Sequence, residues 1–127
     1  MDNLVDLAEI TPVPVWENVT ARRVQGERIT MAVVELGPGA VVPEHRHRNE
    51  QTGMVLQGEV RFRVGDQERR LGPGGTWRIL GDVLHAVVAG PDGAVVIDVF
   101  TPIRSDWDKL SPLARTRPSW PPDPRGR

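Results

Sequence analysis

Between residues 19 and 103 the chain alternates short runs rich in β-branched residues with turns that contain glycine or proline, at intervals of roughly 8–12 residues. The sequence has 13 glycines and 12 prolines in 127 residues, which is high for a helical protein and natural for short strands joined by tight turns. We therefore predict an all-β domain of about nine short strands. A sandwich or a small closed barrel is expected, because closure removes exposed strand edges.

The turn residues set the expected limits of the strands. Gly58 is expected to end one strand, Gly65-Asp66 to turn a hairpin, and Pro91-Asp92-Gly93 to close another hairpin. A helical turn is expected over residues 106–110. The predicted strands are residues 19–24, 29–36, 41–45, 51–57, 60–64, 68–71, 76–79, 85–89 and 94–100.

The domain is expected to span residues 19–105, between two segments of different composition. Residues 1–18 form an irregular lead-in, in which Pro12 and Pro14 exclude a long helix. Residues 111–127 are rich in proline and arginine and have little to bury. This last segment is expected to be disordered or draped over the surface.

Composition excludes several classes of function. The net charge of −1, from 16 basic and 17 acidic residues, gives no reason to expect binding to nucleic acid or to an anionic membrane. No apolar run approaches the ~20 residues that span a bilayer, and the first residues do not resemble a signal peptide. The absence of cysteine excludes disulfides and thiolate ligands, and a cytoplasmic location is expected.

The three histidines are the main candidates for a functional site. His45 and His47 are separated by one residue, so on a strand both side chains would point to the same face. His85 opens another predicted strand, and all three imidazoles could converge inside one barrel. Imidazole is the commonest metal ligand, and three such nitrogens suit a divalent first-row ion.

Two segments resemble the two motifs of the cupin family. Residues 39–58 follow the pattern G-x5-H-x-H-x3-Q-x6-G, where the family usually has glutamate in place of Gln51. Residues 74–85 read G-x5-L-x-D-x2-H, where Leu80 and Asp82 replace the usual proline and glycine. The resemblance covers residues 20–103 and uses every histidine of the chain.

The resemblance implies a single small β-barrel of the double-stranded β-helix or jelly-roll type, assembled as a homodimer. It also implies one divalent transition metal per chain, with Zn, Ni, Fe, Mn and Cu all possible. The residues at the motif's metal positions are His45, His47, Gln51 and His85. The ion could serve catalysis or could only brace the barrel.

The fourth ligand position falls on Gln51 rather than on the neighbouring carboxylate of Glu50. Counting back seven residues from Gly58 reaches Gln51. Strand alternation turns Gln51 inward with Val55 and turns Glu50 outward. The run of residues 49–51 also resembles a subset of cupins whose fourth ligand is glutamine. Four neutral ligands would leave the charge of the ion uncancelled, which favours a small anionic substrate.

The last predicted strand carries an isolated carboxylate. Asp98 interrupts an apolar run and shares a face with Val96 and Phe100, so alternation predicts that it looks into the pocket. Arg104 could fold back over the mouth of the pocket. Two interpretations stay open: a structural ion pair between Asp98 and Arg104, or two side chains that handle substrate.

A second resemblance concerns the end of the domain. Residues 98–107 read D-V-F-x-P-x-R-x-D-W and, together with H-x-H-x2-E-Q at residues 45–51, are similar to the pectin-degradation cupins of the KdgF type. Those proteins help to convert 4,5-unsaturated monouronates to linear keto acids. The resemblance implies catalytic roles for Asp98 and Arg104 and substrate contacts for Phe100 and Arg104.

The resemblance predicts a metal-dependent lyase or isomerase that opens and tautomerises a uronate-like acid. A metal-dependent dioxygenase and a non-catalytic binding module are the alternatives.

Overall fold

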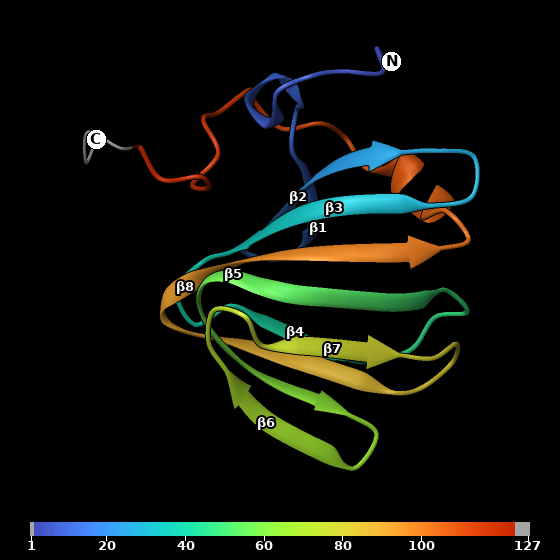
Figure 1. Ribbon diagram of the computed structural model, residues 1–127, viewed down its shortest axis with the longest axis vertical. Helices are drawn as coiled ribbons and strands as arrows, with labels where there is room; N and C mark the ends of the chain where they lie inside the picture. The colour runs from blue at the N-terminus through green and yellow to red at the C-terminus, as the bar shows by residue number, and fades with distance from the viewer. Residues whose placement is uncertain (1, 124–127) are drawn as a thin grey trace.

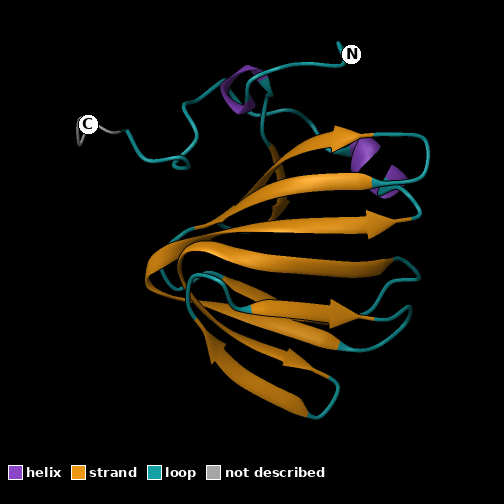
Figure 2. Ribbon diagram, in the orientation of Figure 1, coloured by secondary structure: helices purple, strands orange, loops and turns teal. Residues whose placement is uncertain are grey.

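The computed structural model describes residues 2–123, which form one strongly bent antiparallel sheet with two 3₁₀ helices outside it (Figures 1 and 2). The helices are η1 (Leu7–Glu9) and η2 (Ser105–Lys109). The strands are β1 (Val13–Trp16), β2 (Val19–Gln25), β3 (Thr30–Leu36), β4 (Val41–His45), β5 (Glu50–Val64), β6 (Gln67–Leu71), β7 (Thr76–Ile79) and β8 (His85–Thr101). The predicted all-β class is confirmed, and no helix in the described part has the length and apolar character to cross a membrane.

The sheet is organised around its two longest strands. Its order is β1-β2-β3-β8-β5-β6, while β4 pairs with β8 and β7 pairs with β5. β5 and β8 run antiparallel along their whole length, from Glu50 opposite Thr101 to Val64 opposite His85. Both bend at the same end of the molecule in Figure 1, so each strand contributes to both halves of the bent sheet.

The prediction that Gly58 and residues 91–93 end strands is wrong, because the chain bends there without leaving the ladder. The β5–β8 register shifts between Val55 and Gln57 and again between Gly58 and Val60, and such bulges bend a strand while pairing continues. Gly58 has a φ of 78°, and a side chain there would overlap the backbone of Gly93. Glycine is therefore needed at the bend, but it marks a corner rather than a strand end.

The lead-in is less irregular than predicted, because β1 was not expected from the sequence. It pairs with β2, with Val13 opposite Ala21. Pro14 is compatible with this position since β1 has one strand partner, and an edge strand tolerates a missing backbone N–H. Among residues 2–123, no ladder gives β1 or β6 a second partner, so the predicted closure is not a complete ring of hydrogen bonds.

The C-terminal segment is draped over the surface as far as residue 123. Arg22, only 2% exposed, points away from the pocket and donates from Nη2 to the carbonyl oxygen (2.7 Å) and Oγ1 (3.0 Å) of Thr116. The N–H of Leu113 donates to the carbonyl of Pro12. Residues 124–127 of the predicted tail lie outside the described residues.

Alternation along the strands turns one set of side chains toward the interior, where they form the core. In β3, Ala32, Val34 and Leu36 are buried and face inward. Full burial of one valine or leucine side chain contributes roughly 1.5–3 kcal/mol. Val34 and Leu36 also line the pocket, so part of the core forms the apolar part of its wall. The core thus holds the strand register that positions the site.

Candidate metal centre

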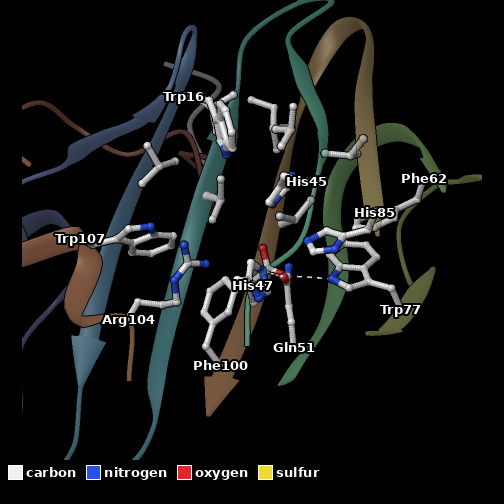
Figure 3. A pocket seen from close by; sticks show the side chains of 18 residues that line it. Trp16, His45, His47, Gln51, Phe62, Trp77, His85, Phe100, Arg104 and Trp107 are labelled. Carbon is white, nitrogen blue, oxygen red and sulfur yellow. Dashed lines mark hydrogen bonds between the residues drawn. The ribbon is translucent and has the colours of Figure 1, made fainter. Parts of the chain in front are cut away.

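The three histidines meet on one wall of the pocket (Figure 3). His45 ends β4, His85 begins β8, and the two residues are paired across these strands. Their ring centroids lie 4.2 Å apart, and that of His47 lies 4.8 Å from His85. One ligand atom from each ring can be chosen so that all three lie within 4.8 Å of one another. His45, His47 and His85 therefore form a group that could hold a metal ion.

The predicted strand 41–45 is confirmed, so strand alternation does not explain why both His45 and His47 reach the pocket. β4 ends at His45, and His47 lies in the bend that follows. The β4–β8 register shifts between Val42 and His45, a bulge of the kind that redirects side chains beside functional sites. The bend is held by a hydrogen bond from the N–H of Asp82 to the carbonyl of His47.

Every histidine is oriented by the backbone close to it in sequence. A carbonyl oxygen only accepts, so the Nδ1 atom that faces it must carry the proton. The acceptors, all two residues away, are Pro43 for His45 (2.7 Å), Asn49 for His47 (3.0 Å) and Val83 for His85 (2.9 Å). This arrangement fixes the tautomer and leaves the Nε2 lone pairs for a ligand.

Burial keeps at least two of the imidazoles neutral. Burial lowers the pKa of His85 to about 4, and burial together with the charge of Arg104 lowers the pKa of His47. The Nε2 of His85 is buried and has no hydrogen-bond partner among the described residues. An unpaired buried acceptor is unfavourable unless a cation or a donor occupies the space in front of it.

Gln51 adds an oxygen to the same space. It is 6% exposed at the start of β5, whereas Glu50 is exposed on the opposite face, as alternation predicted. Its Nε2 donates to Asp98 Oδ1 at 2.8 Å, and its Oε1 lies 3.2 Å from Nε2 of His47. When His47 is neutral, both atoms at that contact are acceptors. The donor set, three neutral nitrogens and one amide oxygen with facing lone pairs, fits a divalent transition ion.

Asp98 lies behind Gln51 on β8 and is almost fully buried. Its Oδ1 accepts from Gln51 and, at 2.7 Å, from Nε1 of Trp77. No described residue donates to its Oδ2. Burial raises the pKa of Asp98 to about 6, opposed by these two hydrogen bonds and by the charge of Arg104. The carboxyl therefore has one anchored oxygen and one that is free to exchange a proton.

Arg104 lies at the other end of the pocket and does not pair with Asp98. Its guanidinium lies 4.7 Å from the ring centre of Phe100 and 4.5 Å from that of Trp107. Nε and Nη2 donate to the two carboxylate oxygens of Asp106 at 3.0 and 2.9 Å. The predicted alternative of an Asp98–Arg104 ion pair is wrong, because a partner two residues away satisfies the arginine. Nη1 has no hydrogen-bond partner among the described residues.

Two residues that sequence reasoning did not assign to the site connect its parts. Trp77 is part of the buried core cluster, lines the pocket and donates to Asp98. Asn49 is buried and donates from Nδ2 to the carbonyls of Pro102 (2.7 Å) and Ile103 (3.3 Å). Asn49 thus joins the histidine bend to the segment that precedes Arg104. The signal in the sequence was an amide side chain, Asn49, two residues after His47.

The rest of the pocket is apolar. The cavity measures about 70 Å³, so it admits a small molecule or one end of a larger one. Apart from the aromatic rings, its apolar lining consists of Val15, Val19, Val34, Leu36, Val42, Val87 and Val96. Trp16 of β1 lies above His45, with ring centroids 5.1 Å apart (Figure 3).

Comparison with known proteins agrees with this fold and site. Residues 32–100, more than half of the chain, match the family model of the cupin domain. Over 80 residues the chain is 29% identical to the pectin degradation protein KdgF of Dickeya dadantii (strain 3937), covering 62% of this chain and 73% of that protein.

Solved structures give the same result. The structure of KdgF from Halomonas sp. superposes with a TM-score of 0.76 at 27% identity, covering 84% of this chain and 98% of that one. An RmlC-like cupin from Shewanella frigidimarina NCIMB 400 superposes with a TM-score of 0.78 at 21% identity, covering 84% of this chain and 96% of that one. The second likeness concerns the fold alone.

Proposed function

The chain belongs to the cupin family, and we propose that it is a metal-dependent enzyme that opens and tautomerises a small, carboxylate-bearing, uronate-like substrate. The observation that carries the proposal is the convergence, in one small pocket, of a histidine group that could hold a metal, a buried carboxyl with one free oxygen, and an arginine.

The proposed metal ligands are His45, His47 and His85 through Nε2, and Gln51 through Oε1. These four ligands are neutral, so a divalent ion would keep its charge and act as a Lewis acid toward an anionic substrate oxygen. The metal could be Zn, Ni, Fe, Mn or Cu, since nitrogen and oxygen ligands accept all of them.

Arg104 is proposed to bind and neutralise the substrate. Two of its donor nitrogens are occupied by Asp106, which holds the guanidinium plane in place. Nη1 remains to donate to a substrate carboxylate or to an oxygen on which negative charge develops. Phe100 lies under the guanidinium and lines the pocket, so it would contact the body of the substrate.

Asp98 is proposed to move the proton. Ring opening breaks the hemiacetal carbon–oxygen bond, and the proton of the hemiacetal hydroxyl leaves while the ring oxygen becomes an enol hydroxyl. Tautomerisation then transfers a proton from that enol oxygen to carbon and gives a ketone. No electrons are exchanged with an outside reagent. Oδ2, with the carboxyl pKa raised to about 6, suits a group that both accepts and donates a proton near neutral pH.

The choice of a uronate rests on the relatives. The chain is 29% identical to a pectin degradation protein and 27% identical to a second KdgF, and pectin is a polymer of galacturonate. The pocket chemistry supports an acid of small size, and the relatives supply the class of acid.

The proposal is tested by mixing metal-loaded protein with 4,5-unsaturated galacturonate and following the loss of enol-ether absorbance. We expect loss faster than the spontaneous rate, and equal rates with and without oxygen. No acceleration by fully loaded protein contradicts the proposal. Activity that disappears without oxygen in the iron-loaded protein supports the alternative of a dioxygenase.

The variant Asp98→Asn separates proton transfer from structure. Asparagine can keep an oxygen at the Oδ1 position, where it accepts from Gln51 and Trp77, but its amide cannot replace Oδ2 as a proton carrier. We expect kcat to fall by about 10²–10⁴-fold, with metal affinity retained. Unchanged kcat in Asp98→Asn would remove Asp98 from the mechanism.

A homodimer and a cytoplasmic location stay predictions. Light scattering on the purified protein measures the mass in solution. A single species near the chain mass of 14.1 kDa contradicts the homodimer, and twice that mass supports it.

A further inference from the structure

We infer that Trp77 is a positioning residue for the proposed metal ligand Gln51 and acts through Asp98. The inference rests on the proposed metal centre, but it concerns how this chain orients an amide, not which reaction follows. It assigns a role to a tryptophan whose position alone is consistent with plain core packing.

The three side chains are brought together by the register of three neighbouring strands. On β5, Gly53 lies opposite Trp77 of β7 on one side and opposite Asp98 of β8 on the other. The indole N–H reaches across Gly53 to Asp98 Oδ1 at 2.7 Å, and the amide of Gln51 reaches the same oxygen at 2.8 Å (Figure 3). One carboxylate oxygen therefore connects the tryptophan to the amide.

Gly53 makes this crossing possible. A Cβ built on Gly53 would overlap the indole nitrogen of Trp77 and would lie 2.5 Å from Asp98 Oδ1. Any side chain at this position would therefore separate the donor from the acceptor. Glycine in the interior of a strand weakens the strand and often marks a close approach, which is the role it has here.

The indole is held on its other side as well. The ring of Trp77 stacks on Phe62, with centroids 4.6 Å apart and an interplanar angle of 25°, and the residue is 6% exposed. Such a stacked arrangement is one of the favourable geometries for a pair of aromatic rings. The N–H direction is therefore fixed, and the fixed N–H holds Asp98 Oδ1 in place.

The orientation of the Gln51 amide must be fixed, because its oxygen and its NH₂ group are similar in shape but one accepts and the other donates hydrogen bonds. With the amide reversed, the NH₂ group would face the Nε2 lone pair of His47, now 3.2 Å from Oε1, and would form a hydrogen bond there. The histidines alone thus favour the reversed amide, which presents donors where a cation should bind. Reversal would also place Oε1 against Asp98 Oδ1, so an anchored carboxylate excludes it.

The test is the affinity of the protein for Co²⁺, measured by titration of its visible absorption. Trp77→Phe keeps an aromatic ring against Phe62 and removes the N–H. We expect about 10-fold weaker binding, as for other groups that orient a metal ligand, and an altered absorption spectrum of bound Co²⁺. Trp107→Phe is the matched control, since Trp107 lines the same pocket without donating to Asp98, and it should bind Co²⁺ like the wild type.

A double-mutant cycle distinguishes positioning from a general structural effect. In a Gln51→Ala background there is no amide to orient, so adding Trp77→Phe should not weaken Co²⁺ binding further. An equal loss in both backgrounds overturns the inference, and so does unchanged affinity of Trp77→Phe in the wild-type background. If the wild type itself binds no Co²⁺, the metal centre fails, which is a separate result.

A second variant covers the case in which Trp77→Phe does not fold. Asp98→Leu has a similar size and removes the acceptor, so Gln51 is released while the indole stays in place. We expect Co²⁺ binding at least as weak as in Trp77→Phe, again only when Gln51 is present. Wild-type affinity in Asp98→Leu contradicts the inference.

Discussion

The two ends of the pocket are built in different ways. At the histidine end, His45, His47 and His85 each donate to a carbonyl two residues away, so local backbone sets their direction. At the arginine end, Arg104 lies in the segment after β8, and its N–H donates to Oγ1 of Thr30, 74 residues away. The comparison teaches that the directions of the histidine rings are a local property, whereas the position of the Arg104 backbone depends on a long-range tether.

The largest effect is expected from the histidine end. His85→Ala removes one of three converging nitrogens and should weaken metal binding by more than about 100-fold, beyond the 10–100-fold typical of groups behind a ligand. Zinc at 100 times the wild-type Kd stabilises a folded protein by about 2.7 kcal/mol, and this gain should vanish in the variant.

Thermal unfolding with zinc and with chelator measures this effect. Arg46→Ala is the control, because Arg46 is exposed between the two histidines of the motif and should keep the zinc-dependent rise in Tm. A zinc-dependent rise that survives in His85→Ala would mean that the ion binds elsewhere.

A smaller effect is expected at the arginine end, and on a different quantity. Arg104→Lys keeps the positive charge. A lysine has no planar group that can donate twice to Asp106, lie between two aromatic rings and still present a third donor to the substrate. We expect kcat/KM to fall by about 10–100-fold, or about 1.4–2.7 kcal/mol, with Co²⁺ affinity unchanged. If metal affinity fell by the same factor, the two ends could not be treated as independent.

The smallest effect is expected where the two ends are joined. Asn49→Ala removes two hydrogen bonds to the segment before Arg104, while the carbonyl of residue 49 still accepts from His47. Pro102 is exposed and Ile103 is half-buried, so losing these hydrogen bonds should cost about 0.5–1.5 kcal/mol of unfolding free energy each, and we expect KM to rise a few-fold. Denaturant unfolding measures the loss of stability, and steady-state kinetics measure the rise in KM. If metal affinity fell by a larger factor than KM rose, the histidine end and the arginine end would not be independent.

Strand alternation predicted much of the architecture because β5 and β8 are paired along both edges for much of their length. It placed Gln51, Asp98 and Phe100 toward the pocket and Glu50 outward. Motif spacing predicted the cupin fold, which the family match and the superpositions confirm. These inferences need only the period of a strand and the order of residues.

The remaining features depend on register and loops, which the sequence does not specify locally. Trp77 reaches Asp98 only because both lie opposite Gly53. The bends at Gly58 and in the middle of β8 were mistaken for strand ends, since a glycine signal is the same for a corner and for a turn. Asp106 was overlooked as the partner of Arg104 because the sequence also offered Asp98 at a plausible distance.

The local orientation of the histidines has a consequence for how such a pocket can evolve. Each imidazole is oriented by a backbone carbonyl two residues away, so its direction should be kept when residues elsewhere in the sheet change. The fourth position is different: its amide depends on Asp98, 47 residues away, which in turn depends on Trp77 and on a glycine between them. Replacing glutamine by glutamate would set two carboxylates against each other and would require a matching change at residue 98. Descendants of this chain should therefore keep their histidines while residues 51, 53, 77 and 98 change together or not at all.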